Sequence, residues 1–169
     1  MAYGVGRMGT WVGMTSAMVA AAMVVTVAPM GTAPASVAAP ANPCHVLKAA
    51  EIKKAFGKDV GSPSRNDGLC AWDLAGGIGK KGGGSVEVEV DNGPAAVQNF
   101  EGFATAGEAI AGLGDRAFYG PGYQSGFNVL KGGTYLRLSA TFGLLGKEPS
   151  AARVRSKLAK LTNIAVKHI

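Results

Sequence analysis

The sequence predicts an α+β domain in which one antiparallel sheet of four to five strands is covered on one face by about three helices. Short runs of alternating apolar and polar residues, bounded by glycine, predict the strands. In Ser85–Val90, for example, valines alternate with serine and glutamates. Helical patterns separate hairpin-like pairs of such runs instead of single strands, which favours antiparallel pairing over strand–helix–strand crossovers.

The first half of the domain should hold one helix and two strands. Apolar residues recur at helical spacing between Val46 and Gly57, where glycine provides a stop. A turn-rich segment follows and ends in Asp67-Gly68, after which Leu69–Leu74 is predicted to be a strand. The glycine- and lysine-rich run Gly76–Gly84 is expected to be a mobile hairpin tip before the next strand.

The second half should begin with a helix that has proline at its first position, Pro94. Its buried stripe is expected to consist of Val97, Phe100, Phe103 and Ala104. Strands are then predicted at Ala117–Tyr119, Gly126–Lys131 and Thr134–Phe142. The last two are joined by Gly132-Gly133, a favourable hairpin turn.

The last helix combines an apolar stripe with a basic face. It should begin after Ser150, and its apolar residues at helical spacing are Val154, Leu158, Leu161 and Ala165. Arg153, Lys157 and Lys160 are interpreted first as a solvated face. The alternative is that these three residues contact an anionic envelope polymer or a lipid surface.

The start of the chain has the pattern of an export signal. Thr10–Met30 contains no charged residue, and Arg7 is the only charge before it. Small residues follow, with cleavage sites after Ala35 and Ala38. We therefore expect a signal peptide at 1–35, a flexible lead-in at 36–43 and the exported domain at 44–169. The alternative is an uncleaved membrane anchor, because about 20 apolar residues can span a bilayer.

The chain has 169 residues, a net charge of +6 and two cysteines, Cys44 and Cys70. An exported chain meets an oxidising compartment, so we expect these cysteines to form a disulfide. Closing a loop of about 27 residues should stabilise the domain by roughly 3 to 4 kcal/mol. Pro43 disfavours lipid attachment at Cys44, so no lipid anchor is expected. Free thiols and a zinc site are the disfavoured alternatives.

No catalytic constellation is recognised. Ser125 misses the Gly-x-Ser-x-Gly elbow by one position, and the glycine-lysine run does not fit a phosphate-binding loop. His45 adjoins a cysteine and His168 is the penultimate residue, so neither is a convincing general base. We expect no catalytic residue, metal or cofactor. Nucleic-acid binding is not expected either, because the chain is expected to be exported and has no nucleic-acid recognition motif.

Three residues are candidate ligand contacts. Tyr119 and Tyr123 flank a Gly-Pro-Gly loop that displays aromatic rings among residues poorly able to bury them. Asp115 lies in a glycine-rich turn, where its carboxylate either binds a ligand or accepts hydrogen bonds from nearby backbone amides.

Four motifs occur in a fixed order along the chain: Pro43-Cys44 before a short helix, Cys70-Ala71-Trp72, Gly112-Leu113-Gly114-Asp115-Arg116-Ala117 and Leu130-Lys131-Gly132. Together they resemble small exported or lipid-anchored actinobacterial proteins that carry a domain of unknown function. The resemblance covers about residues 43–165. The chain departs from the common pattern at Lys48, where a helix-capping Thr or Ser is more usual. It also lacks a lipid-attachment cysteine. The resemblance implies an envelope or extracellular location and brings no catalytic residues.

Three classes of function remain open. The first is an exported, envelope-associated or secreted binding or accessory module, for which we expect an apolar or aromatic cleft. The second is a basic domain that adheres to an anionic envelope polymer or lipid through a continuous basic face. The third is a hydrolase with an unrecognised site, for which titratable groups should converge in a pocket.

Overall fold

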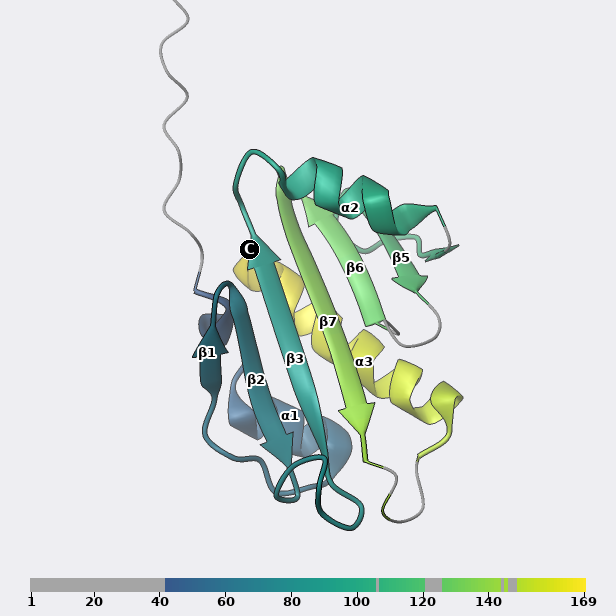
Figure 1. The fold of residues 1–169 in the computed structure, drawn as a ribbon. Coiled ribbons are helices and arrows are strands. Elements are labelled where there is room, and N and C mark those ends of the chain that lie inside the picture. Colours follow the sequence, from purple (N-terminus) through teal and green to yellow (C-terminus); the bar gives the residue numbers. More distant parts are fainter. Residues whose placement is uncertain (1–41, 106, 121–125, 144, 146–148) are drawn as a thin grey trace, which may run out of the picture. The chain divides into compact units, whose positions relative to one another are not determined.

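The computed structural model describes residues 42–105, 107–120, 126–143, 145 and 149–169. These residues form an α+β domain with a seven-stranded antiparallel sheet in the order β1-β2-β3-β7-β6-β5-β4 (Figure 1). Its elements are the 3-10 helix η1 (Pro43–His45), α1 (Ala49–Phe56), β1 (Ser64–Asn66), β2 (Leu69–Leu74), β3 (Gly84–Asp91), α2 (Ala96–Ala104), β4 (Glu108–Ala109), β5 (Arg116–Gly120), β6 (Gly126–Lys131), β7 (Thr134–Phe142), α3 (Ala151–Ala165) and the 3-10 helix η3 (Val166–His168).

The sheet is wider than the four to five strands predicted from the sequence. The two strands that were missed, β1 and β4, are its edges, with three and two residues that are all exposed. An edge strand without buried side chains has no apolar alternation, so its sequence carries no strand signal. Both edges are recognisable only by their pairing with β2 and β5.

Alternate residues of the sheet form the main core beneath α1 and α3. Those exposed by 1% or less include Trp72, Val86, Val88, Leu136 and Leu138. Helix α3 contributes Val154, Leu158, Leu161 and Ala165, the four residues predicted for its apolar stripe. Ser150 caps this helix by accepting a hydrogen bond from the Arg153 N–H.

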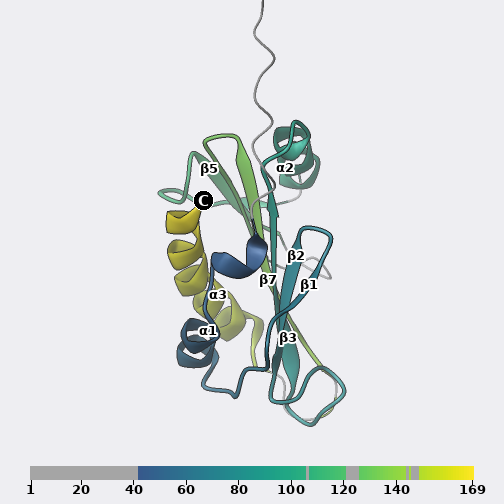
Figure 2. The same ribbon diagram turned by 90° about the vertical axis from the view of Figure 1, so that its left-hand side faces the viewer.

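The prediction that all helices cover one face is wrong. Figure 2 shows α1 and α3 on one side of the sheet and α2 on the other. Helix α2 buries Ala96 and Phe100 against Phe118, Leu130 and Tyr135. Val97 and Phe103 were expected to be buried but are 45% and 40% exposed. The buried residues of α2, Ala96 and Phe100, lie four apart along one narrow side, which faces β5, β6 and β7.

The N-terminal end of the described chain is tied to the sheet. A disulfide joins Cys44 in η1 to Cys70 in β2 with a Cα–Cα distance of 5.2 Å, as predicted. The Asn42 Oδ1 accepts a hydrogen bond from the Cys44 N–H at 3.1 Å, and Pro43 is buried. Pro43, assigned to the flexible lead-in by the sequence, is therefore part of the folded domain.

The predicted signal peptide, 1–35, lies outside the described residues, as does most of the predicted lead-in. Within the described part, no helix has both the length and the apolar character needed to cross a bilayer.

Replacing Leu158 by alanine should lower the free energy of unfolding by about 2 to 5 kcal/mol, because the side chain is fully buried and its loss leaves a cavity. Its exposed fraction is 0%. Urea denaturation measures the change. Val97→Ala is the matched control: this side chain is 45% exposed, and its loss should change stability by about 0.5 kcal/mol at most. Equal effects of the two substitutions would contradict the packing described here.

Candidate functional site

A groove of about 710 Å³ runs between α1 and α3. Its apolar lining residues include Ala55, Leu161 and Ile164. The charged lining residues are Glu51 and Lys54 from α1 and Arg153, Lys157 and Lys160 from α3. Four cationic side chains and one carboxylate thus line a partly apolar groove.

None of the four cations is neutralised by a carboxylate within the described residues. The ion pairs found there join Lys53 to Asp59, Arg116 to Glu101, Arg137 to Glu89 and Arg155 to Glu108. The one carboxylate of the groove, Glu51, accepts a hydrogen bond from the Lys48 N–H at 2.7 Å, which caps α1. The groove therefore has an excess of positive charge.

Arg155 shows how a cation of the same helix is paired elsewhere. Its guanidinium donates to both carboxylate oxygens of Glu108, at 2.7 and 2.6 Å, and stacks over the Tyr119 ring at 4.7 Å. The hydrogen bond to Arg155 is the main reason why the pKa of Glu108 is lowered. Arg153, two residues earlier, has no such partner among the described residues.

Lys157 is half-buried, whereas the other three groove cations are exposed, and it contacts the end of α1. Its ammonium donates a hydrogen bond to the Phe56 carbonyl at 3.1 Å and lies 5.2 Å from the centre of the Phe56 ring. The C-terminal end of a helix favours a cation, because its carbonyl groups carry partial negative charge. The face of an aromatic ring attracts a cation as well. Burial lowers the pKa of Lys157, and the charges of Arg153, Lys58 and Lys160 lower it further. A bound anion would offset that repulsion.

The structure brings together the three basic residues that the sequence singled out, because Arg153, Lys157 and Lys160 all line this groove. The description of this face as merely solvated is wrong for Lys157, which is half-buried and hydrogen-bonded. The sequence pattern did not identify Lys54 or the apolar lining residues of the groove as parts of one site. The lysine pair Lys53-Lys54 in the last turn of α1 was visible in the sequence. That Lys54 belongs to a groove follows only from the packing of α1 beside α3.

Of the other predicted contacts, Asp115 and Tyr119 are described, and each has its own partner. Asp115 accepts a hydrogen bond from the Gly132 N–H at 2.7 Å, and its own N–H donates to the Leu130 carbonyl at 2.8 Å. Its carboxylate therefore stabilises the β6–β7 turn, which is the second of the two roles considered for it, acceptance of a backbone hydrogen bond. Tyr119 is half-buried, with its ring 5.1 Å from the Phe127 ring in an edge-on contact. Tyr123 lies outside the described residues.

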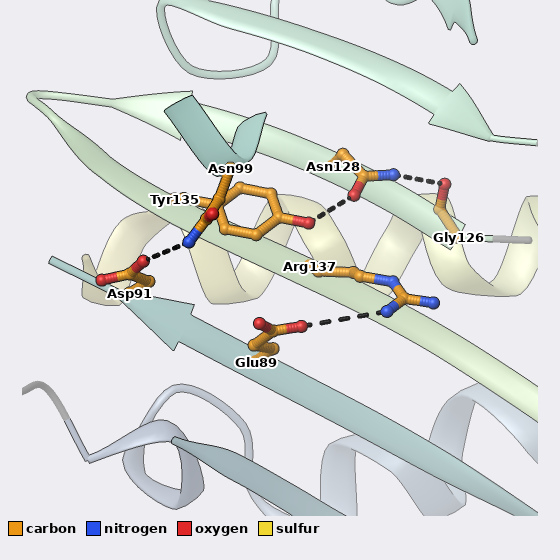
Figure 3. Close-up of polar contacts among 7 residues, drawn as sticks. All are labelled: Glu89, Asp91, Asn99, Gly126, Asn128, Tyr135 and Arg137. Carbon is orange, nitrogen blue, oxygen red and sulfur yellow. Dashed lines mark hydrogen bonds and ion pairs between the residues drawn. The ribbon is translucent and has the colours of Figure 1, made fainter. Parts of the chain in front are cut away.

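A second polar cluster lies on the opposite face of the sheet, around α2 (Figure 3). The buried Tyr135 hydroxyl donates to Asn128 Oδ1 at 2.8 Å, and Asn128 Nδ2 donates to the Gly126 carbonyl at 3.3 Å. Burial raises the pKa of Tyr135, so this hydroxyl stays protonated. Asn99 of α2 donates to Asp91 of β3 at 2.9 Å. These groups satisfy one another, so we assign the cluster a structural role.

Within the described residues, no three histidine, cysteine or acidic side chains gather closely enough to hold a metal ion. The groove offers cationic donors and apolar contacts, which suit binding of an anion.

Comparison with protein-family models, with curated proteins and with solved structures finds no match for this chain. The resemblance to exported actinobacterial proteins stays a prediction that depends on the sequence motifs.

The substitution Arg153→Gln should raise the pKa of Lys157 toward its ordinary value, because it removes one of the positive charges that disfavour the ammonium. Titration of the Lys157 side chain by NMR measures this. Lys167→Gln is the control, since the exposed Lys167 is not among the groups that shift Lys157.

The lowered pKa also has a consequence for stability. Between the folded-state pKa of Lys157 and the higher unfolded-state value, the unfolded chain binds more protons, so this group's contribution to stability rises with pH. Arg153→Gln should reduce that rise. An unchanged Lys157 pKa in Arg153→Gln would show that the two charges do not interact.

Proposed function

We propose that this protein is an exported binding module, secreted or associated with the cell envelope, and that the α1–α3 groove binds a ligand with an anionic group and an apolar part. The observation that carries the proposal is a set of four cations, Lys54, Arg153, Lys157 and Lys160, that no carboxylate of the described residues pairs, along a groove with apolar residues in its lining.

Two features support export. Disulfides such as Cys44–Cys70 persist in oxidising compartments outside the cytoplasm. The uncharged segment Thr10–Met30, followed by small residues, has the composition of a signal sequence.

The chemistry of the groove defines the class of ligand. Its volume, about 710 Å³, falls in the usual range for small-molecule sites, about 300 to 1,000 Å³. Arg153 can donate two parallel hydrogen bonds to a phosphate or carboxylate, and Lys54 and Lys160 act as flexible point charges. Ala55, Leu161 and Ile164 can contact hydrocarbon. An anionic amphiphile meets both requirements, whereas a free inorganic anion leaves the apolar lining unused.

Dodecyl phosphate, below its micelle concentration, is a suitable probe, with inorganic phosphate as the comparison. Dodecyl phosphate should bind more tightly, because its chain contacts the apolar lining. The double substitution Arg153→Glu/Lys160→Glu should weaken dodecyl phosphate binding by at least about tenfold, since hydrogen bonds to charged groups contribute about 1.5 to 3 kcal/mol each. Calorimetry measures the affinities. Lys157 is left intact because it also bonds to Phe56.

The matched control is Arg65→Glu/Lys167→Glu, which makes the same change in net charge at two exposed residues outside the groove. It should bind the probe nearly as the parent does. An equal loss in both double variants would show that the general positive charge, and not the groove, attracts the anion. That result would favour the adhesion hypothesis.

A further inference from the structure

The β2–β3 loop and two described residues after β7, Gly143 and Leu145, are hydrogen-bonded to each other at one end of the sheet. The Gly82 N–H donates to the Leu145 carbonyl at 2.6 Å, and the Gly143 N–H donates to the Gly83 carbonyl at 3.2 Å. Gly143 lies directly against Ile78: a Cβ atom added at Gly143 would be 1.9 Å from the Ile78 carbonyl oxygen. Any larger residue at Gly143 would separate the two loops.

The β2–β3 loop has a defined conformation, although its composition predicted a mobile tip. Successive backbone hydrogen bonds join Gly77 to Leu74, Lys80 to Gly77 and Gly83 to Lys80, at 3.1, 3.1 and 2.9 Å. Lys58 Nζ also donates to the Gly82 carbonyl. A loop held in this way loses little conformational entropy when it binds a surface.

This surface displays two large apolar side chains to solvent. Ile78 is 45% exposed and Leu145 is 58% exposed. Lys80 and Lys81 are exposed on the same loop. We call Ile78, Lys80, Lys81 and Leu145 the loop tip.

The loop tip is amphipathic and basic. Among the described residues, Asp73 is an acid close to this loop, since its Oδ1 lies 3.2 Å from the position of a Cβ atom added at Gly77. It forms no ion pair with Lys80 or Lys81 among the described residues. Exposed apolar side chains flanked by lysines match the boundary of an anionic bilayer, where apolar groups enter the acyl region and ammonium groups approach the lipid phosphates.

We propose that the loop tip docks on an anionic lipid surface by inserting Ile78 and Leu145, with Lys80 and Lys81 at the phosphate level. Two apolar side chains are too small a surface for a stable protein partner, which needs about 1,000 Å² in total. They suffice for weak, reversible binding to a membrane when anionic lipid adds its attraction. This surface is separate from the α1–α3 groove and does not depend on the groove's function.

Co-sedimentation with phosphatidylglycerol–phosphatidylcholine vesicles tests the docking, with pure phosphatidylcholine vesicles as the neutral comparison. The protein is used as isolated from the cells that express it, with the same N-terminus in every variant by mass spectrometry. The parent should bind the anionic vesicles, and the binding should weaken steeply with salt. Equal binding to neutral vesicles would overturn the role of the lysines.

Ile78→Ser and Val97→Ser form a matched pair, because both side chains are 45% exposed and only Ile78 belongs to the loop tip. Ile78→Ser should lower the partition coefficient on anionic vesicles by about tenfold, and Val97→Ser should leave it unchanged. Thermal unfolding should show both variants folded. Equal behaviour of the two variants on vesicles would overturn the proposal.

A second pair tests the charges. Lys80→Gln/Lys81→Gln should weaken vesicle binding more than Arg65→Gln/Lys167→Gln, which removes the same charge elsewhere. Ile78→Ser should still bind dodecyl phosphate as the parent does, so failure at the loop tip and failure at the groove are distinguishable. A concentration-dependent dimer in sedimentation velocity that Ile78→Ser abolishes would assign the loop tip to self-association and overturn docking on lipid.

Discussion

The pairing of β3 with β7 holds the two halves of the chain together. It extends from Gly84 opposite Phe142 to Asp91 opposite Tyr135. The sheet order attaches β1 and β2 through β3, and β4, β5 and β6 through β7. A slip of one residue would turn the valines of β3 away from the core and its glutamates into it, so the register is strongly specified. Helices α1 and α3 both pack on the face of the sheet that carries these valines, and the groove lies between them.

The positive charge of the groove costs little stability while most of its cations remain in water. Lys54, Arg153 and Lys160 are exposed, where solvent screens their repulsion. Lys157 is the exception, since it is half-buried and depends on the Phe56 carbonyl. Arg155 and Glu108 show that α3 can pair a cation when a carboxylate is at hand. The polar groups in Figure 3 are paired as well. The groove is thus one place where the described domain gathers several cations that no described carboxylate pairs, and an anion would be stabilised there.

Local pattern predicted the strands well where one face is buried. The bounds of β2, β6 and β7 agree with the sequence to the residue, because alternation and flanking glycines mark both ends. The face on which α2 packs could not be predicted, since a helical stripe shows that one side is buried but not against what. Asp115 and Tyr119 are close in sequence but have different roles. Asp115 accepts a hydrogen bond from the β6–β7 turn, and Tyr119 packs on Phe127. The loop tip was missed for a similar reason: the hydrogen bond from Gly82 to Leu145 links distant parts of the chain.

The end of α1 connects the groove to the loop tip. The Phe56 carbonyl accepts the hydrogen bond of Lys157, and the Phe56 ring lies 5.8 Å from the ring of Phe142 at the end of β7. Two residues later, Lys58 reaches the Gly82 carbonyl in the β2–β3 loop. The charge of Lys58 also contributes to the lowered pKa of Lys157. Neutralising Lys58 would therefore remove one of the charges that lower the pKa of Lys157. The turn after α1 therefore supports both surfaces structurally, while the groove and the loop tip keep separate binding residues.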